Sequence, residues 1–235
     1  MDHWRNLTLW CRERFKARRY VPLAFVLSGP ALGFFPDWPM IWALLLLLQA
    51  RLADDFFSRE KDRALHPDRR PIPDALGKLC VALILINATP LFGLNALASV
   101  SYTAFLLLQW PRLPASLKYA ALAVLIDSSV PIASPLILVH GFVVAFAAIV
   151  FELGHDPLPS CGLRLSYALG LIPLLLFMPW LPAAGALLSF FFIVLGFLRL
   201  WPPMEFSAHG RWLYSSSAHV GAAVIAASLF HPLFP

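Results

Sequence analysis

Charged side chains are scarce in this chain. Asp, Glu, Lys and Arg together make up 13% of its 235 residues, about half of the roughly 25% that is usual in a soluble domain. Hydrophobic residues make up 60%, and the mean hydropathy is +0.73. A water-soluble domain of this size cannot bury so much apolar surface. The composition therefore predicts an integral membrane protein in contact with membrane lipids.

Cysteine is also rare, and the first residues do not have the pattern of a secretory signal. Cys11, Cys80 and Cys161 lie far apart without a CxxC spacing, which indicates neither a disulfide framework nor a zinc site. The first residues are too charged for a secretory signal, and no cleavage-type sequence follows an apolar core. We expect 1–19 to form an amphipathic cytoplasmic segment that lies against the membrane surface.

Apolar runs of spanning length recur along the chain. A transmembrane helix needs about 20 mostly apolar residues, and about nine segments approach this length. They are 20–36, 38–54, 75–93, 95–110, 116–134, 136–153, 165–181, 183–201 and 214–233. The sequence therefore predicts an all-α fold, a multi-pass transmembrane helical bundle of about nine helices, in a single domain that covers 1–235.

The basic residues predict an orientation for this bundle. If the N-terminus is cytoplasmic, all 18 Lys and Arg fall in cytoplasmic segments or at the cytoplasmic ends of the spans, and none falls in an outer turn. The formal net charge of +5 is thus explained by the membrane boundary, and we expect no nucleic-acid partner.

Carboxylates gather where the second and sixth predicted spans end. Asp54 and Asp55 end the second span and Asp62 follows, whereas Glu152 and Asp156 end the sixth. On a continuing helix, Asp55 and Asp62 share one face. Clustered carboxylates repel one another unless a cation lies between them, and oxygen ligands at this density suit Mg²⁺.

Basic side chains accompany these carboxylates. Arg51 and Arg70 flank the first acidic group, and Arg112 and Lys118 belong to the next cytoplasmic loop. Guanidinium and ammonium groups bind phosphate oxygens, so both sets together predict a metal-bridged diphosphate at the cytoplasmic end of the bundle. The competing interpretation is an ordinary solvated loop that orients the protein.

Asp127 falls inside the fifth predicted span. An intramembrane carboxylate is a functional candidate by default. It is either a proton acceptor for the substrate or a polar tie to Ser128, Ser129 or a neighbouring helix. His140 begins the sixth span on the outer side, and we interpret it as a turn cap or interface residue.

The stretch RLADDFFSREKDRALHPDRRPIP, Arg51–Pro73, resembles the first aspartate-rich motif of the UbiA superfamily of intramembrane aromatic prenyltransferases. Asp54, Asp55 and Asp62 align with acidic positions of that motif. The stretch is most similar to a bacterial branch that reads Arg-Leu-x-Asp-Glu…His-Pro-x-Arg-Pro. The family has nine transmembrane helices, with acidic motifs after the second and the sixth, and the "WPR" that ends at Arg112 resembles its basic position.

The resemblance implies Mg²⁺-dependent transfer of a polyprenyl group from a prenyl diphosphate to an aromatic or other lipophilic acceptor. It implies a bacterial cytoplasmic membrane and an active site that faces the cytoplasm. The implied metal ligands are Asp54, Asp55, Asp62, Glu152 and Asp156. The catalytic candidates are Asp54, Asp55, Asp62 and Asp127, and the diphosphate-binding candidates are Arg51, Arg70, Arg112 and Lys118.

An alternative is a non-catalytic UbiA-like membrane homologue that serves in lipid binding, assembly or transport. Ser58 stands where the family has an aspartate, and the second acidic segment offers only Glu152 and Asp156. A phosphatidyl-type transferase is disfavoured because its Asp-Gly-x-x-Ala-Arg pattern is absent. The acceptor, the prenyl chain length and the oligomeric state stay open.

Overall fold

The computed structural model describes residues 2–32, 38–60, 64, 75–109, 115–130, 134–155, 161–177, 179 and 183–200. Throughout these ranges the regular structure is helical and contains no strand, which confirms the all-α prediction for this part of the chain. The helices are α1 (Asp2–Arg14), α2 (Ala17–Leu32), α3 (Trp38–Phe57), α5 (Ala75–Ala88), the 3₁₀ helix η1 (Thr89–Gly93), α6 (Ala96–Leu108), α7 (Ala115–Asp127), α8 (Ser134–His155), α9 (Cys161–Phe177) and α10 (Ala183–Leu200).

The first eight predicted spans each coincide with helical structure. α3 and α10 begin at the predicted residues, and α5 together with η1 covers the predicted span 75–93. Proline and charged residues bound these apolar runs, so the helix positions follow from the hydropathy pattern. The ninth predicted span, 214–233, lies outside the described residues.

Two helical stretches in the described ranges are long and apolar enough to cross a membrane, judged by length and composition. They are Leu76–Gly93 and Pro135–Leu153. Two further apolar helices, Ala96–Leu108 and Cys161–Leu176, are shorter. The two longer helices give weak support for membrane association, and the multi-pass topology stays a prediction.

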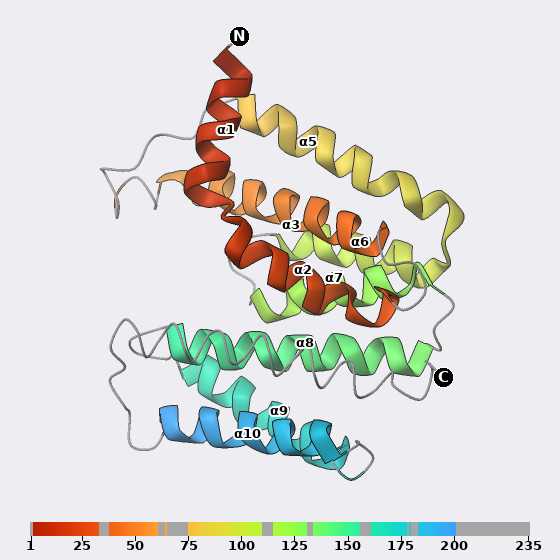
Figure 1. Ribbon diagram of the computed structural model, residues 1–235, viewed down its shortest axis with the longest axis vertical. Helices are drawn as coiled ribbons and strands as arrows, with labels where there is room; N and C mark the ends of the chain where they lie inside the picture. Colours follow the sequence, from red (N-terminus) through yellow and green to blue (C-terminus); the bar gives the residue numbers. More distant parts are fainter. Residues whose placement is uncertain are drawn as a thin grey trace.

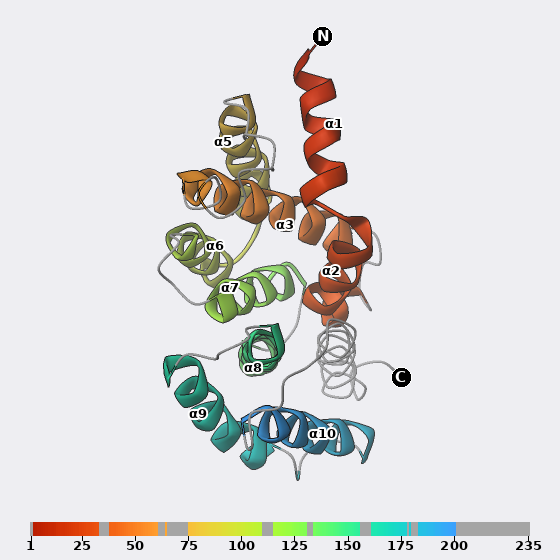
Figure 2. The same ribbon diagram turned by 90° about the vertical axis from the view of Figure 1, so that its left-hand side faces the viewer.

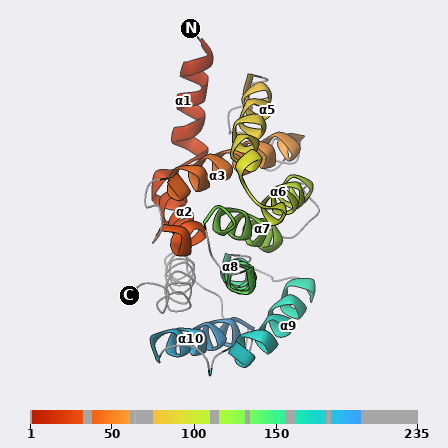
Figure 3. The ribbon, with the colours of Figure 1, turned by 90° about the vertical axis from the view of Figure 1, so that its right-hand side faces the viewer.

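Most of the helices from α2 to α10 run roughly along one direction, whereas α9 is slanted relative to α8 and α1 crosses that direction near one end of the array (Figure 1). Viewed from the sides, α8 lies between α7 and the pair formed by α9 and α10 (Figures 2 and 3). α5 lies at the opposite end of the long axis from that pair. α3 and α8 both end on the side where α1 lies (Figure 1).

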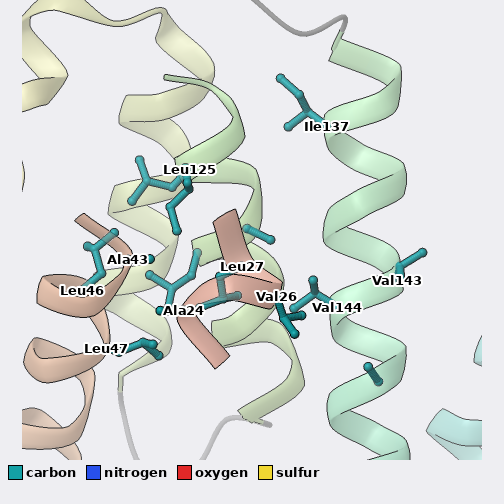
Figure 4. Packing of buried hydrophobic residues seen from close by; sticks show 14 of the residues in the cluster. Ala24, Val26, Leu27, Ala43, Leu46, Leu47, Leu125, Ile137, Val143 and Val144 are labelled. Atoms are coloured by element: carbon teal, nitrogen blue, oxygen red, sulfur yellow. The ribbon is translucent and has the colours of Figure 1, made fainter. Parts of the chain in front are cut away.

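The buried core extends over α2, α3, α6, α7, α8, α9 and α10. Figure 4 shows part of this cluster, to which α2, α3, α7 and α8 contribute Ala24, Val26, Leu27, Ala43, Leu46, Leu47, Leu125, Ile137, Val143 and Val144. Gly141 of α8 lets this helix approach α7 closely, because a Cβ atom there would lie 2.6 Å from Val124 Cγ2. Small residues at helix contacts permit this kind of backbone approach.

Large apolar side chains also lie on the outside of the bundle. Phe92 is 95% exposed, and the exposed set extends over α5, α6, α9 and α10 with Leu85, Val100, Leu107, Leu176 and Leu187. Soluble monomers rarely expose large contiguous apolar patches. A surface of this kind favours contact with lipid.

Candidate functional site

The acidic end of α3 packs against α1. Asp55 is fully buried, and its Oδ2 accepts a hydrogen bond of 2.9 Å from the indole N–H of Trp10. Arg14 Nη1 lies 3.5 Å from Asp55 Oδ1, and Arg51 forms an ion pair with the same oxygen from one turn earlier in α3. Two guanidinium groups and an indole therefore compensate one buried carboxylate.

Apolar packing holds α1 in this position. Trp10 forms a buried cluster with Leu52 of α3 and with Leu76 and Leu83 of α5. The expected N-terminal helix is present as α1, and its residues Leu7, Trp10 and Cys11 belong to the cluster formed with α3 and α5. This contact places Arg14 beside Asp55.

Asp54 has a different environment from its neighbour. Its side chain is 47% exposed, and its Oδ2 accepts a hydrogen bond of 3.1 Å from Arg51 Nη1. The hydroxyl of Ser58 donates a hydrogen bond of 2.6 Å to the backbone carbonyl of Asp54 and so extends the end of the helix. Asp54 is thus an accessible carboxylate, whereas Asp55 is enclosed.

Tyr119 lies on the side of the bundle where α3 and α8 end. This residue lies near the start of α7, close enough to Tyr20, Asp54, Glu152 and Arg51 to interact with each electrostatically. Asp54 belongs to the end of α3 and Glu152 to the end of α8. One carboxylate from each acidic segment therefore contributes to the electrostatic environment of the same tyrosine. We call Arg14, Tyr20, Arg51, Asp54, Asp55, Tyr119 and Glu152 the charge cluster.

The surroundings of Asp55 do not fit a metal ligand. Its oxygens face Trp10, Arg14 and Arg51, which a cation would have to displace. Burial raises the pKa of the Asp55 carboxyl above its ordinary value, and Arg51, the Trp10 hydrogen bond and Arg14 act in the opposite direction. Asp54, which is partly exposed, fits a cation better.

The described residues contain no group of three or more His, Cys, Asp or Glu side chains placed to hold a metal ion. Two of the proposed metal ligands, Asp62 and Asp156, lie outside these residues, as do the proposed diphosphate ligands Arg70 and Arg112. Lys118 is half-buried on α7 and precedes Tyr119.

The structure does not bring Asp127 to the charge cluster. Asp127 is the last residue of α7 and lies eight residues beyond Tyr119, about 12 Å along the helix at about 1.5 Å per residue. It pairs with His140 of α8, with 2.6 Å between Asp127 Oδ2 and His140 Nδ1. The hydroxyls of Ser128 and Ser129 donate instead to backbone carbonyls.

Comparisons with protein-family models, with curated proteins and with solved structures return no match to this chain. The resemblance to the UbiA superfamily therefore depends on the residues of Arg51–Pro73 and on the order of the helices. Within that motif the structure describes 51–60 and residue 64.

Sequence reasoning did not assign a role at the site to Trp10, Arg14, Tyr20 or Tyr119. Trp10 and Arg14 are separated by four positions and so share one face of α1. An aromatic residue and a cation on one face of an amphipathic helix could have indicated that this face packs against an acidic group. Tyr20 and Tyr119 gave no comparable signal, because their approach depends on how α2 and α7 pack.

Replacing Trp10 by phenylalanine tests the contact between α1 and α3. The substitution keeps an aromatic ring but removes the donor to Asp55, so we expect the free energy of unfolding to fall by about 1–3 kcal/mol. Unfolding of the purified protein in detergent measures this change. Trp38→Phe is the control, because Trp38 is 45% exposed. Equal losses in the two variants would contradict a specific role for the indole N–H.

Proposed function

We propose that this chain is a UbiA-like intramembrane prenyltransferase. It would transfer a polyprenyl group from a prenyl diphosphate to an aromatic or other lipophilic acceptor. The observation that carries this proposal is that α3 and α8, which carry Asp54 and Glu152 near their last residues, end on the same side of the bundle (Figure 1). The motif-like sequence of Arg51–Pro73 supports it.

The residues of the charge cluster have separate proposed roles. Asp54 and Glu152 would hold Mg²⁺, with Asp62 and Asp156 as further ligands. When bound, Mg²⁺ would supply positive charge against the departing diphosphate. Arg51, which already contacts Asp54, would bind phosphate oxygens. Further diphosphate ligands would be Arg70, Arg112 and Lys118.

Asp55 has a positioning role in this proposal. Its contacts with Trp10 and with the guanidinium groups of Arg14 and Arg51 fix the last turn of α3. Because Asp54 is the preceding residue, the same contacts determine where its carboxylate lies.

The membrane setting is part of the proposal. We infer that α2 to α10 cross the bilayer, with the N-terminus and the charge cluster on the cytoplasmic side of a bacterial cytoplasmic membrane. The exposed apolar side chains of α5, α6, α9 and α10 support this inference because lipid would cover them. The prenyl tail would leave the site sideways between helices.

A non-catalytic UbiA-like homologue is the second candidate, and specific contacts favour it. Asp55 is enclosed by Trp10 and two arginines, and the Ser58 hydroxyl bonds to the backbone. Such a protein would bind a prenyl lipid or assist assembly without breaking a diphosphate bond.

Diphosphate release tests the two candidates against each other. Purified protein in lipid nanodiscs is supplied with farnesyl or geranylgeranyl diphosphate, a panel of lipophilic acceptors, and Mg²⁺ or EDTA. We expect release that depends on Mg²⁺ and on an acceptor. Binding of a non-hydrolysable analogue without release would favour the non-catalytic homologue. Neither release nor binding would contradict both candidates.

Replacing Asp54 by asparagine is expected to lower kcat/KM for diphosphate release at least tenfold, or about 1.4 kcal/mol or more in transition-state stabilisation. The unfolding midpoint should stay unchanged, because Asp54 is about half exposed. Glu60→Gln is the matched control, since Glu60 is an exposed carboxylate a few residues further along. An equal loss of activity in both variants would contradict the assignment of Asp54.

A further inference from the structure

A buried polar link joins three helices at a distance from the charge cluster. His140 of α8 lies with Nδ1 2.6 Å from Asp127 Oδ2 of α7 and with Nε2 3.2 Å from the backbone oxygen of Val26 in α2. Asp127 and His140 are both fully buried. A single imidazole thus contacts two neighbouring helices.

The carbonyl group of Val26 lacks its helical partner. In an α-helix the carbonyl of residue 26 accepts from the N–H of residue 30. Residue 30 is proline, which has no N–H. A neighbouring helix usually satisfies a carbonyl freed in this way. His140 Nε2 lies within hydrogen-bonding distance, and it must carry a proton because a carbonyl oxygen only accepts.

The other imidazole nitrogen faces a carboxyl group. A proton must lie between Nδ1 and Asp127 Oδ2, because two lone pairs 2.6 Å apart would repel each other. Asp127 is also the last residue of α7, where the helix dipole already contributes negative charge. Its Oδ1 is buried and makes no hydrogen bond to the described part of the chain. A net negative charge at this place would be costly.

We propose that Asp127 and His140 form a net-neutral pair that holds two protons and fastens the proline-interrupted α2 to α7 and α8. One proton lies between Nδ1 and Oδ2, and the other is on Nε2 and is donated to Val26. Two forms of the pair hold these two protons and have no net charge. In one, an Asp127 carboxylate faces an imidazolium; in the other, a neutral Asp127 carboxylic acid faces a neutral imidazole. His140 is therefore a positioning residue, and this role does not depend on the proposed transferase activity.

The pair also connects to the charge cluster through the helices themselves. α2, α7 and α8 carry Tyr20, Tyr119 and Glu152 near their opposite ends. Fixing the three helices at Val26, Asp127 and His140 restricts where they place these side chains.

A double-mutant cycle between His140 and Pro30 tests the proposal. His140→Phe removes both nitrogens, and we expect it to lower the unfolding midpoint by about 5 °C or more. Pro30→Ala returns an N–H that can reach the Val26 carbonyl within α2. We expect Pro30→Ala to raise the midpoint of the His140→Phe protein more than it raises that of the unsubstituted protein.

The cycle has a matched control in α9. Pro173 lies inside that helix, so Pro173→Ala makes the same chemical change in a helix that contains neither Val26 nor Asp127. Its effect should be equal in both backgrounds. The proposal is overturned if Pro30→Ala also has equal effects in both, because the two sites would then be independent.

Nitrogen NMR of protein labelled at histidine gives a second readout that does not require His140→Phe to fold. Asp127→Asn, which keeps a polar side chain, identifies the His140 signals by their displacement. At neutral pH we expect a proton on Nε2 and a strongly hydrogen-bonded Nδ1. An Nε2 without a proton would overturn the proposal.

Discussion

Replacing Arg51 by leucine is expected to lower the free energy of unfolding by about 3–5 kcal/mol, because it removes one partner of a buried ion pair. Asp55 is fully buried and would keep only Arg14 and the Trp10 indole as partners. Denaturant titration of the purified protein in mixed micelles measures the loss.

Arg59→Leu provides the control for this substitution. Arg59 is exposed and lies over the ring of Phe56 at 5.3 Å, so its removal should cost no more than about 1 kcal/mol. A second substitution, Asp55→Leu, should recover stability in the Arg51→Leu protein, because an apolar residue then replaces the stranded carboxylate. Similar small losses for Arg51→Leu and Arg59→Leu would show that the buried pair does not stabilise this end of α3.

Replacing Gly141 by leucine is expected to cost about 3 kcal/mol or more, because it forces apart two helices of the core. A Cβ atom at this position would lie 2.6 Å from Val124 Cγ2 and 3.4 Å from the backbone oxygen of Ala120. Both neighbours belong to α7, and a backbone oxygen cannot rotate away. The unfolding midpoint in detergent measures the effect.

Gly29→Leu is the matched control for this substitution. Gly29 also lies within a helix, and a Cβ atom there would meet nothing within 4 Å. We expect Gly29→Leu to cost no more than about 1 kcal/mol, because the helix propensity of leucine opposes the effect of Pro30, which disfavours a helical backbone at a preceding residue with a Cβ atom. Val124→Ala should restore part of the stability of the Gly141→Leu protein. A loss at Gly29 as large as that at Gly141 would contradict the close approach of α7 and α8.

The helix positions could be predicted from the sequence because they depend on local composition. Apolar runs between proline and charged residues placed the starts of α3 and α10 at 38 and 183. The start of α2 could not be predicted as accurately from the sequence. This helix begins at Ala17, within the basic segment 1–19, because a helix can continue through charged residues where hydropathy gives no signal.

The candidate site could be predicted only where it follows from helix order. Asp54 and Glu152 end two helices that run toward the same end of the bundle, so their approach follows from an up-and-down arrangement. The burial of Asp55 could not be predicted from helix order. Its indole partner Trp10 lies 45 residues away in the sequence, and the spacing of residues along α3 does not reveal which other helix packs over Asp55. The pairing of His140 with the carbonyl freed by Pro30 depends equally on tertiary packing.

The docking of α1 has a consequence for the order of assembly during synthesis. Trp10 leaves the ribosome long before Leu83, the last residue of the buried cluster that it joins. At roughly 5–20 residues per second, the chain needs about 4–14 s to synthesise the intervening segment. During that time Trp10 cannot complete its buried cluster with α5, whereas its contact with Asp55 and that of Arg14 require only α3. The docking of the first helix is therefore completed in two steps, first on α3 and then on α5.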